Sequence, residues 1–278
     1  MSNCLAACQI PGWRDRIKSA ATSHTRMFLI TSLVPASMFS GFFTQDCQLC
    51  GIRADASLCN PCRRDLPIAV AITCPRCAGH SPAGLECGAC IAEPPAFDQT
   101  LAAFKYRFPL DRLVQSYKFN ENLALVTLFS EAMLETIRRH ADANSQVLPE
   151  RIVALPLARK RLATRGFNQS AVLAERLAAK LGLPYAPHGL LKIRDTPPQA
   201  GLGREARRKN VRGAFDCGES LTGQHVALVD DVMTTGATLS EAAAALKKAG
   251  ARFVSAWVVA RAELLETNSV AVDTDATA

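Results

Sequence analysis

Two adjacent carboxylates followed by small hydroxyl residues are the most chemically suggestive stretch of the chain. Asp230 and Asp231 end an apolar segment, and a short polar run follows Met233. The run reads Thr234, Thr235, Gly236, Ala237 and Thr238. The glycine lets the backbone turn closely around a ligand, while amide groups, hydroxyls and the positive end of a following helix favour a phosphate. The two acids can accept hydrogen bonds from vicinal hydroxyls, which a ribose supplies, or lie near a divalent cation.

The same residues have a plainer interpretation as a threonine cap after a strand, with two solvated acids. An isolated Asp-Asp pair would favour that interpretation, whereas the full run resembles the signature of type I phosphoribosyltransferases. Its glycine spacing fits neither the phosphate-binding loop of ATPases nor the dinucleotide-binding fingerprint. The sequence therefore argues against both of those classes.

A second chemical feature is the repeated spacing of cysteines. Of 11 cysteines, eight form four Cys-x-x-Cys pairs. The pairs are Cys47/Cys50, Cys59/Cys62, Cys74/Cys77 and Cys87/Cys90. Two thiols at this spacing can bind one tetrahedral ion, and a disulfide framework has no reason to repeat it. The simplest grouping places the first two pairs on one structural Zn²⁺ and the last two on another. An interleaved grouping, first pair with third, stays open because spacing does not decide between them.

The other cysteines, Cys4, Cys8 and Cys217, are interpreted as reduced thiols, which suits a cytoplasmic protein. An apolar stretch at residues 27–43 superficially resembles a secretory leader. Because Pro35 and Ser40 interrupt it and it lies late in the chain, we expect a short helix beside the metal module and no membrane span.

Composition allows one full α/β domain and a small accessory one, since 49% of 278 residues are hydrophobic. The net charge of +7 is compatible with phosphate-rich partners and is equally common among ordinary soluble proteins. We expect an extension at residues 1–45, partly disordered with the short apolar helix, and a double zinc ribbon at 46–93. A catalytic-type domain at 97–264 and a flexible tail at 265–278 complete the division.

Strands alternate with helices from residue 97 onward. Hydrophobic patterns predict strands at 98–107, 151–155, 225–230 and 252–260, and helices at 110–119, 122–140, 168–181 and 238–249. The polar, basic stretch 195–212 is expected to be a mobile loop. This alternation predicts a parallel sheet with helices on both faces and ligands beyond the carboxyl ends of the strands.

The run Arg165-Gly166-Phe167-Asn168-Gln169, at the start of an expected helix, sharpens the resemblance. Together with the cysteine pairs and the 230–238 run, it resembles the ComF family, which is associated with DNA uptake in competent bacteria. The resemblance covers nearly all of residues 47–261. It implies an α/β fold, the parallel-sheet type I phosphoribosyltransferase fold, behind a small N-terminal double zinc ribbon.

The resemblance also implies phosphoribosyl pyrophosphate as the ligand, with Asp230 and Asp231 on the ribose hydroxyls, residues 234–238 on the 5′-phosphate, and Mg²⁺ bridging the pyrophosphate. Displacing pyrophosphate from a sugar develops negative charge on the leaving group, which Mg²⁺ and cationic side chains stabilise. The candidate cations are Lys160, Arg161 and Arg165, which are expected on a loop after the strand at 151–155. Each of them alone could be a solvated surface charge. Asp230, Asp231 and Arg165 are the candidate catalytic residues.

Two functions fit these residues. One is an active phosphoribosyltransferase, and the other is a non-catalytic adaptor that binds single-stranded DNA under control of phosphoribosyl pyrophosphate and works with DNA-uptake or recombination proteins. An enzyme needs a pocket that positions the attacking acceptor, and no such pocket is recognisable in the sequence. A zinc-ribbon transcription factor is the weakest alternative, because no element that would enter a DNA groove is recognisable.

Overall fold

The computed structural model describes residues 45–69, 72–119, 122–144, 147–196 and 204–263. The apolar helix expected within residues 27–43 and the tail expected at 265–278 lie outside these residues. No helix in the described ranges is both long and apolar enough to cross a bilayer.

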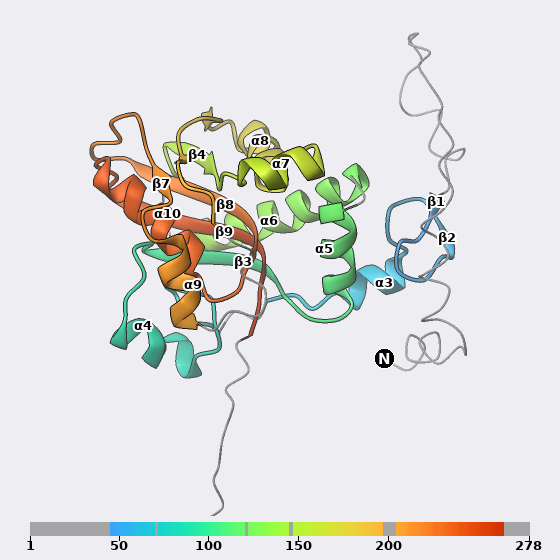
Figure 1. Cartoon of the computed structure of the whole chain (residues 1–278). Coiled ribbons are helices and arrows are strands. Elements are labelled where there is room, and N and C mark those ends of the chain that lie inside the picture. Colours follow the sequence, from blue (N-terminus) through green and yellow to red (C-terminus); the bar gives the residue numbers. More distant parts are fainter. Residues whose placement is uncertain (1–44, 70–71, 120–121, 145–146, 197–203, 264–278) are drawn as a thin grey trace, which may run out of the picture.

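A five-stranded parallel sheet forms the centre of the protein (Figure 1). Its strands are β3 (Gln99–Lys105), β4 (Arg151–Ala154), β5 (Tyr185–Ala186), β8 (His225–Met233) and β9 (Phe253–Arg261). Their order across the sheet is β3-β9-β8-β4-β5, and every neighbouring pair is parallel. The parallel α/β sheet predicted from the alternating pattern is confirmed.

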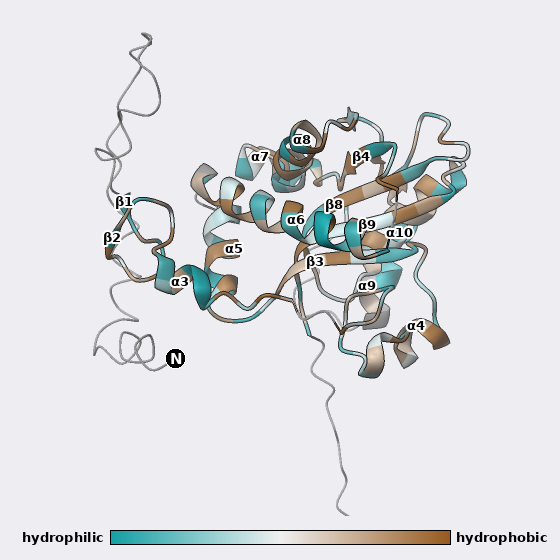
Figure 2. Cartoon of the chain, turned by 180° about the vertical axis from the view of Figure 1, so that it is seen from behind, coloured by the Kyte–Doolittle hydropathy of each residue, from teal (hydrophilic) through white to brown (hydrophobic). Residues whose placement is uncertain are grey.

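Helices cover both faces of this sheet. The helices of one face are α5 (Leu110–Phe119), α6 (Leu123–Asn144) and α8 (Gln169–Leu181), and those of the other are α9 (Arg204–Val211) and α10 (Ala237–Lys248). Successive β8 residues alternate between two cores: Ala227 and Val229 pack with the first set, and Val226 and Leu228 with the second. Figure 2 shows hydrophobic residues along β8 and a hydrophilic outer surface on α6.

Shorter elements complete the fold. They are β1 (Gln45–Asp46), β2 (Arg53–Ala54), α3 (Asn60–Arg64), a 3-10 turn (Pro82–Gly84), α4 (Gly88–Ala92), α7 (Arg159–Arg165), β6 (Leu191–Lys192) and β7 (Phe215–Asp216). Strands β6 and β7 pair antiparallel and lie apart from the central sheet. The short helices α3 and α4 each follow a cysteine directly, at Cys59 and Cys87.

The link between the two cysteine-rich segments runs along the outer edge of β3. The amide of Lys105 donates to the Pro67 carbonyl at 2.7 Å, and the amide of Ala69 donates to the Ala103 carbonyl at 3.0 Å. Ile68 and Phe104 form an antiparallel bridge between these two bonds. Backbone groups of an edge strand that would otherwise face solvent are thereby paired.

Three sequence expectations are corrected. Strand β8 extends to Met233, so the paired acids lie inside a strand, because β9 pairs with that extension through Asp230↔Val258 and Val232↔Ala260. The basic residues after β4 lie on helix α7 and not on a loop. Within the expected loop 195–212, residues 204–211 form helix α9, and 197–203 lie outside the described residues. Strong helix formers such as arginine, glutamate, alanine and lysine dominate that segment.

Candidate functional site

The candidate site lies where the chain leaves two neighbouring strands toward opposite faces of the sheet. From β4 it continues into α7 and α8 on one face, and from β8 it enters α10 on the other. Ala154, the last residue of β4, pairs with Val229 of β8. From Asp230 to Met233, β8 therefore extends beyond the end of β4. Parallel sheets bind ligands at such a switch point, beyond the carboxyl ends of their strands.

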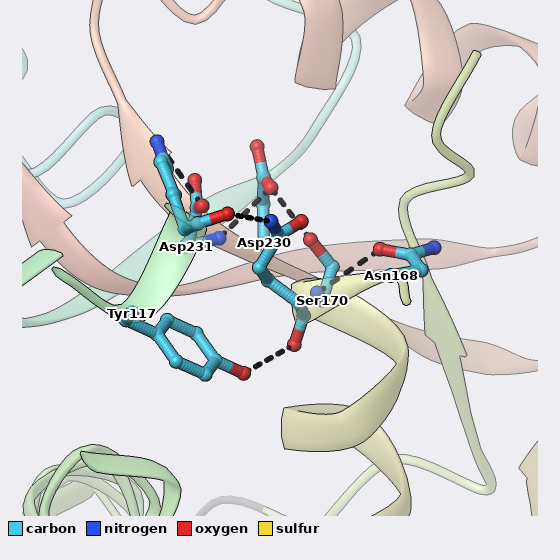
Figure 3. Close-up of polar contacts among 7 residues, drawn as sticks. Tyr117, Asn168, Ser170, Asp230 and Asp231 are labelled. Carbon is cyan, nitrogen blue, oxygen red and sulfur yellow. Dashed lines mark hydrogen bonds and ion pairs between the residues drawn. The ribbon is translucent and has the colours of Figure 1, made fainter. Parts of the chain in front are cut away.

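The two acids are held by different helices (Figure 3). Asp230 Oδ1 accepts a hydrogen bond from Ser170 Oγ at 2.8 Å and another from the Asp231 amide at 2.8 Å. Asp231 is buried, and its Oδ2 lies 3.1 Å from Lys118 Nζ on α5. The structure thus fixes one carboxylate against the first turn of α8 and the other against the end of α5.

The protonation of Asp230 is perturbed. Burial raises the pKa of Asp230 from 3.8 to about 7, with a further contribution from the Asp231 carboxylate, while Ser170 and Lys118 oppose the rise. Arg165 lies within electrostatic range of both acids: burial lowers the pKa of its guanidinium, and Asp231 and then Asp230 counteract that effect in part. A pair of close carboxylates with a poised proton is suited to bind a cation or a hydroxyl-rich ligand.

The Arg-Gly-Phe-Asn-Gln run connects α7 to α8 and sets the position of Ser170. Gly166 ends α7 in the left-handed conformation with φ of 77°. Asn168 caps α8, since its side-chain oxygen accepts from the Ser170 amide at 3.1 Å and its amide group donates to the Leu155 carbonyl at 3.0 Å. Capping of this kind stabilises a helix by about 1 kcal/mol.

Tyr117 on α5 contacts the first turn of α8. It is fully buried, and its hydroxyl donates to the Gln169 carbonyl at 2.8 Å (Figure 3). The ring meets Phe129 and Phe167 edge to face, with centroid separations of 5.5 and 6.1 Å. Burial raises the pKa of the Tyr117 hydroxyl, and the charge of Asp231 adds to the rise, so the tyrosine stays a neutral donor.

The small hydroxyl run forms the turn from β8 into α10. Gly236 has φ of 78° and is the residue before the first turn of α10, whose Ser240 amide donates to the Gly236 carbonyl at 2.8 Å. The Thr235 hydroxyl accepts from the Ala237 amide at 3.4 Å. Ala237 is buried, whereas Thr234, Thr235, Gly236 and Thr238 are partly exposed at the carboxyl edge of the sheet. The first amides of a helix lack intrahelical partners, so this turn can offer donors to an anion.

The three candidate cations on α7 have different surroundings. Arg165 is partly buried, and the charges of Asp231 and Asp230 partly offset the lowering of its pKa by burial. Burial lowers the pKa of the Lys192 ammonium on β6, and the positive charge of Arg161 lowers it further. Lys160 is exposed. Arg165 is therefore within electrostatic range of the acids, and Arg161 is within electrostatic range of Lys192.

Sequence reasoning missed Lys118, Ser170 and Lys192. Lys118 occurs near the end of an ordinary amphipathic helix, and Lys192 in a two-residue strand, so neither belongs to a motif. Ser170 follows a recognisable helix cap at Asn168, and that cap was the available signal for it. The Lys192 ammonium donates to Thr196 Oγ1 at 3.0 Å and lies 5.6 Å from the Phe215 ring centroid.

The eight paired cysteines form two separate clusters. One contains Cys47, Cys50, Cys59 and Cys62, and the other contains Cys74, Cys77, Cys87 and Cys90. Within each, all sulfur atoms lie within 4.8 Å of one another, which confirms the sequential grouping over the interleaved one. A tetrahedral zinc site with Zn–S bonds of about 2.3 Å requires sulfur separations of about 3.8 Å. The Sγ–Sγ distances are 3.7 Å for Cys50–Cys59 and 3.7 Å for Cys77–Cys87.

The two clusters pack against different parts of the α/β domain. In the first, Cys47 and Leu49 are buried in the core that contains α5 and α6, and Asn122 Nδ2 donates to Gln48 Oε1 at 2.6 Å. In the second, the Arg76 carbonyl accepts from the β3 residue Thr100 at 2.7 Å through Thr100 Oγ1. Four thiolates fit Zn²⁺ and leave no position open for a substrate.

The parallel sheet, the acid pair at its carboxyl edge and the glycine turn define a phosphoribosyltransferase-type domain. Residues 168–275 match the family model described as "Phosphoribosyl transferase domain". The chain is 33% identical over 221 residues to the DNA utilization protein YhgH of Salmonella typhi, covering 77% of this chain and 96% of that one. It is 31% identical over 217 residues to competence protein F of Haemophilus influenzae, covering 75% of this chain and 92% of that one. The chain belongs to the ComF/YhgH family.

A solved structure, the purine phosphoribosyltransferase of Pyrococcus horikoshii, aligns with 49% of this chain and 84% of its own at 19% identity. The TM-score of this alignment is 0.31.

Proposed function

We propose that this protein binds phosphoribosyl pyrophosphate with Mg²⁺ and transfers its phosphoribosyl group to an acceptor. One observation carries the proposal: the acid pair Asp230 and Asp231 and the glycine turn at Gly236 lie together on one partly exposed edge of the sheet. Carboxylates complement the vicinal hydroxyls of a ribose, and the start of α10 complements its 5′-phosphate. The spacing of the two features along β8 suits a sugar phosphate lying across them.

In this proposal Asp230 and Asp231 accept hydrogen bonds from the ribose hydroxyls, and the turn at residues 234–238 holds the 5′-phosphate. The developing positive charge on the sugar during displacement is then stabilised by the nearby carboxylates. The Ser170 hydroxyl and Lys118 ammonium keep these carboxylates in place before the ligand arrives. Prepositioned groups of this kind need no reorganisation when charge develops.

The leaving pyrophosphate is assigned to Lys160, Arg161 and Arg165 together with Mg²⁺. Arg165 is the strongest candidate of the three, because it is within electrostatic range of both Asp230 and Asp231. Bound Mg²⁺ would supply charge neutralisation for the leaving group. The acids provide oxygen ligands of the type that this cation prefers.

Zn²⁺ is the ion proposed for both cysteine clusters, with a structural role. Four thiolates at tetrahedral separation favour Zn²⁺ over cations that prefer oxygen ligands. The resulting closed sites would stabilise two small segments that lack a large apolar core of their own.

The cellular role proposed is in DNA uptake and natural transformation, in the cytoplasm. The support is that family relatives are named competence protein F and DNA utilization protein. These names also favour the second candidate function, an adaptor that binds single-stranded DNA and phosphoribosyl pyrophosphate without turnover. DNA-uptake or recombination proteins would be its partners.

Calorimetric titration with phosphoribosyl pyrophosphate and Mg²⁺ tests the binding site. Asp231→Asn is expected to weaken binding by about tenfold or more. The variant loses a charged acceptor for the ligand, and it also loses the ion pair in which Lys118 Nζ lies 3.1 Å from Asp231 Oδ2. Asp142→Asn, at an exposed position on α6, is the control and should leave affinity unchanged. The zinc content of both variants should equal that of the unmodified protein. Equal affinity for Asp231→Asn would refute the assignment.

A pyrophosphate-release screen separates the two functions. The protein is mixed with phosphoribosyl pyrophosphate, Mg²⁺ and candidate bases or amines, with and without single-stranded DNA. Release above the background rate with one acceptor supports the transferase. Saturable binding without release across the screen supports the adaptor.

A further inference from the structure

A buried arginine at the end of β9 connects three backbone segments. Arg261 is 7% exposed, and its Nε donates to the Cys77 carbonyl at 2.8 Å. Its Nη1 donates to the carbonyl of Met233 at 3.4 Å and also contacts the carbonyls of Thr234 and Ala262. One guanidinium therefore contacts both the second cysteine cluster and the start of the turn at residues 234–238.

These contacts are energetically significant because they are charge-assisted and wholly or partly buried. A buried cation must find acceptors, and the planar guanidinium offers five N–H donors in a fixed geometry. Removing this donor takes a charged partner from three partly buried carbonyls, whereas the Met233 carbonyl keeps its hydrogen bond from the Ala262 amide at 2.9 Å. The carbonyl of Thr234 is thus kept in one orientation, and the peptide groups after it follow.

Arg261 also lies near a side chain of the second cysteine cluster. A methyl group built on Gly79 would be 3.3 Å from Cys77 Sγ and 3.7 Å from Arg261 Nη2, and the positive charge of Arg261 acts on the Cys77 thiol. A cysteine bound to a metal is a thiolate, and its negative charge would attract the neighbouring guanidinium. Metal binding and the position of Arg261 are therefore physically connected.

A second contact joins the same side of the molecule to α10. Immediately after the second cluster, the Ala96 amide donates to Ser240 Oγ in the first turn of α10 at 3.0 Å. Phe97 is buried, and its ring lies 3.5 Å from where a Cβ on Gly236 would be. The contacts of the first cluster run instead to α6 and the residue before it, through Arg63 and Glu131 at 3.9 Å and through Gln48 and Asn122.

We propose that Arg261 is a positioning residue through which the Cys74–Cys90 cluster orders the turn at residues 234–238. Cys77 is one of the four thiols that would hold the metal, and its carbonyl accepts from Arg261 Nε at 2.8 Å. The guanidinium in turn holds the Thr234 carbonyl, so that the turn presents its amides to the ligand phosphate. The ligand in this statement rests on the proposed function. The ordering of the turn by the cluster is independent of which anion binds there.

The first test is Arg261→Lys, which keeps the charge and all eight cluster thiols but loses the planar fork. Hydrogen exchange at residues 234–239 is expected to become about tenfold faster, the scale of one lost charge-assisted hydrogen bond. Affinity for phosphoribosyl pyrophosphate should fall by a similar factor, and both metal ions should remain bound. A merely structural role would instead speed exchange throughout the sheet.

The second test uses two matched cysteines, Cys87→Ser and Cys59→Ser. Each cysteine is partly buried, precedes a five-residue helix, and has a partner sulfur at 3.7 Å. Each variant should lose one metal ion per chain. Only Cys87→Ser is expected to speed hydrogen exchange at residues 234–239 and to weaken ligand binding. Adding Arg261→Lys to Cys87→Ser should cause little further change, because both substitutions disrupt the same contact between the second cluster and the turn.

The inference would be overturned if the Arg261→Lys variant had both a hydrogen-exchange rate at residues 234–239 and an affinity within twofold of those of the unmodified protein. Equal responses of the turn to Cys59→Ser and Cys87→Ser would also overturn it. If Cys87→Ser does not fold, Arg261→Lys decides alone, since it leaves every cluster ligand in place. Should the unmodified protein fail to bind phosphoribosyl pyrophosphate while the exchange differences appear, the proposed function is wrong and the positioning role of Arg261 stands.

Discussion

Replacing Asp230 by asparagine should make the protein more stable and less able to bind its ligand. Asparagine has nearly the same shape, and its oxygen can still accept hydrogen bonds from Ser170 Oγ and from the Asp231 amide. It carries no charge, so neither burial nor the neighbouring Asp231 carboxylate penalises it. The ribose hydroxyls would lose a charged acceptor.

The size of the effect follows from the pKa. A pKa raised from 3.8 to about 7 corresponds to at most about 4 kcal/mol of lost stability once the group is ionised. The folded protein binds the proton more tightly than the unfolded chain, so stability falls as pH rises from about 4 to about 7 and the loss is complete above that. Between pH 5 and pH 8 the limit is about 2.5 kcal/mol, and since Asp230 is partly exposed and therefore partly screened by solvent, we expect about 1 kcal/mol.

Thermal unfolding at pH 5 and pH 8 measures this difference. Relative to the unmodified protein, Asp230→Asn should gain about 1 kcal/mol on moving from pH 5 to pH 8, or about 2–4 °C in Tm at this chain length. Asp142→Asn, at an exposed position on α6, should track the unmodified protein at both values. An Asp230→Asn variant whose relative stability is the same at both pH values would refute the account of the buried pair.

Two further predictions concern the turn and the metal clusters. Gly236→Ala and Gly182→Ala both place a side chain at positive φ, 78° and 67°, and each should cost about 1 kcal/mol of stability. Titration should show weaker binding of phosphoribosyl pyrophosphate for Gly236→Ala only, because Gly182 ends α8 with no neighbour within 4 Å of the new Cβ; matched affinities would contradict the role of the turn. Elemental analysis should find about two zinc ions per chain, and a value below one would disprove the metal assignment.

Most of the main elements could be predicted from local patterns. The helix expected at 168–181 is followed in the sequence by Gly182, and in the structure this glycine ends α8 in the left-handed conformation. The extension of β8 to Met233 could not be predicted from local sequence. It depends on β9, which pairs with β8 as far as Met233, whereas β4 pairs with β8 only as far as Val229. Helix α9 was not predicted because its composition is polar; among its described side chains, Val211 is buried and anchors its end.

The candidate site was predictable only where its residues are neighbours in the sequence. The acids and the hydroxyl turn form one run, whereas Ser170 lies 60 residues before Asp230 and meets it only after folding. Arg261 is 184 residues from Cys77, and a lone arginine after an apolar strand gives no sign of such a contact. Long-range partners of this kind follow from topology, which spacing alone does not give.

The strand order has a consequence for synthesis on the ribosome. β9 is the last strand of the central sheet to be made, yet it lies between β8 and β3, the first strand of that sheet to be made. Until β9 emerges, β3 has no parallel neighbour and only the segment at residues 67–69 beside it. The nascent protein would therefore hold an open slot in its sheet, and early capture of metal by the cysteines would keep the N-terminal part compact during that wait.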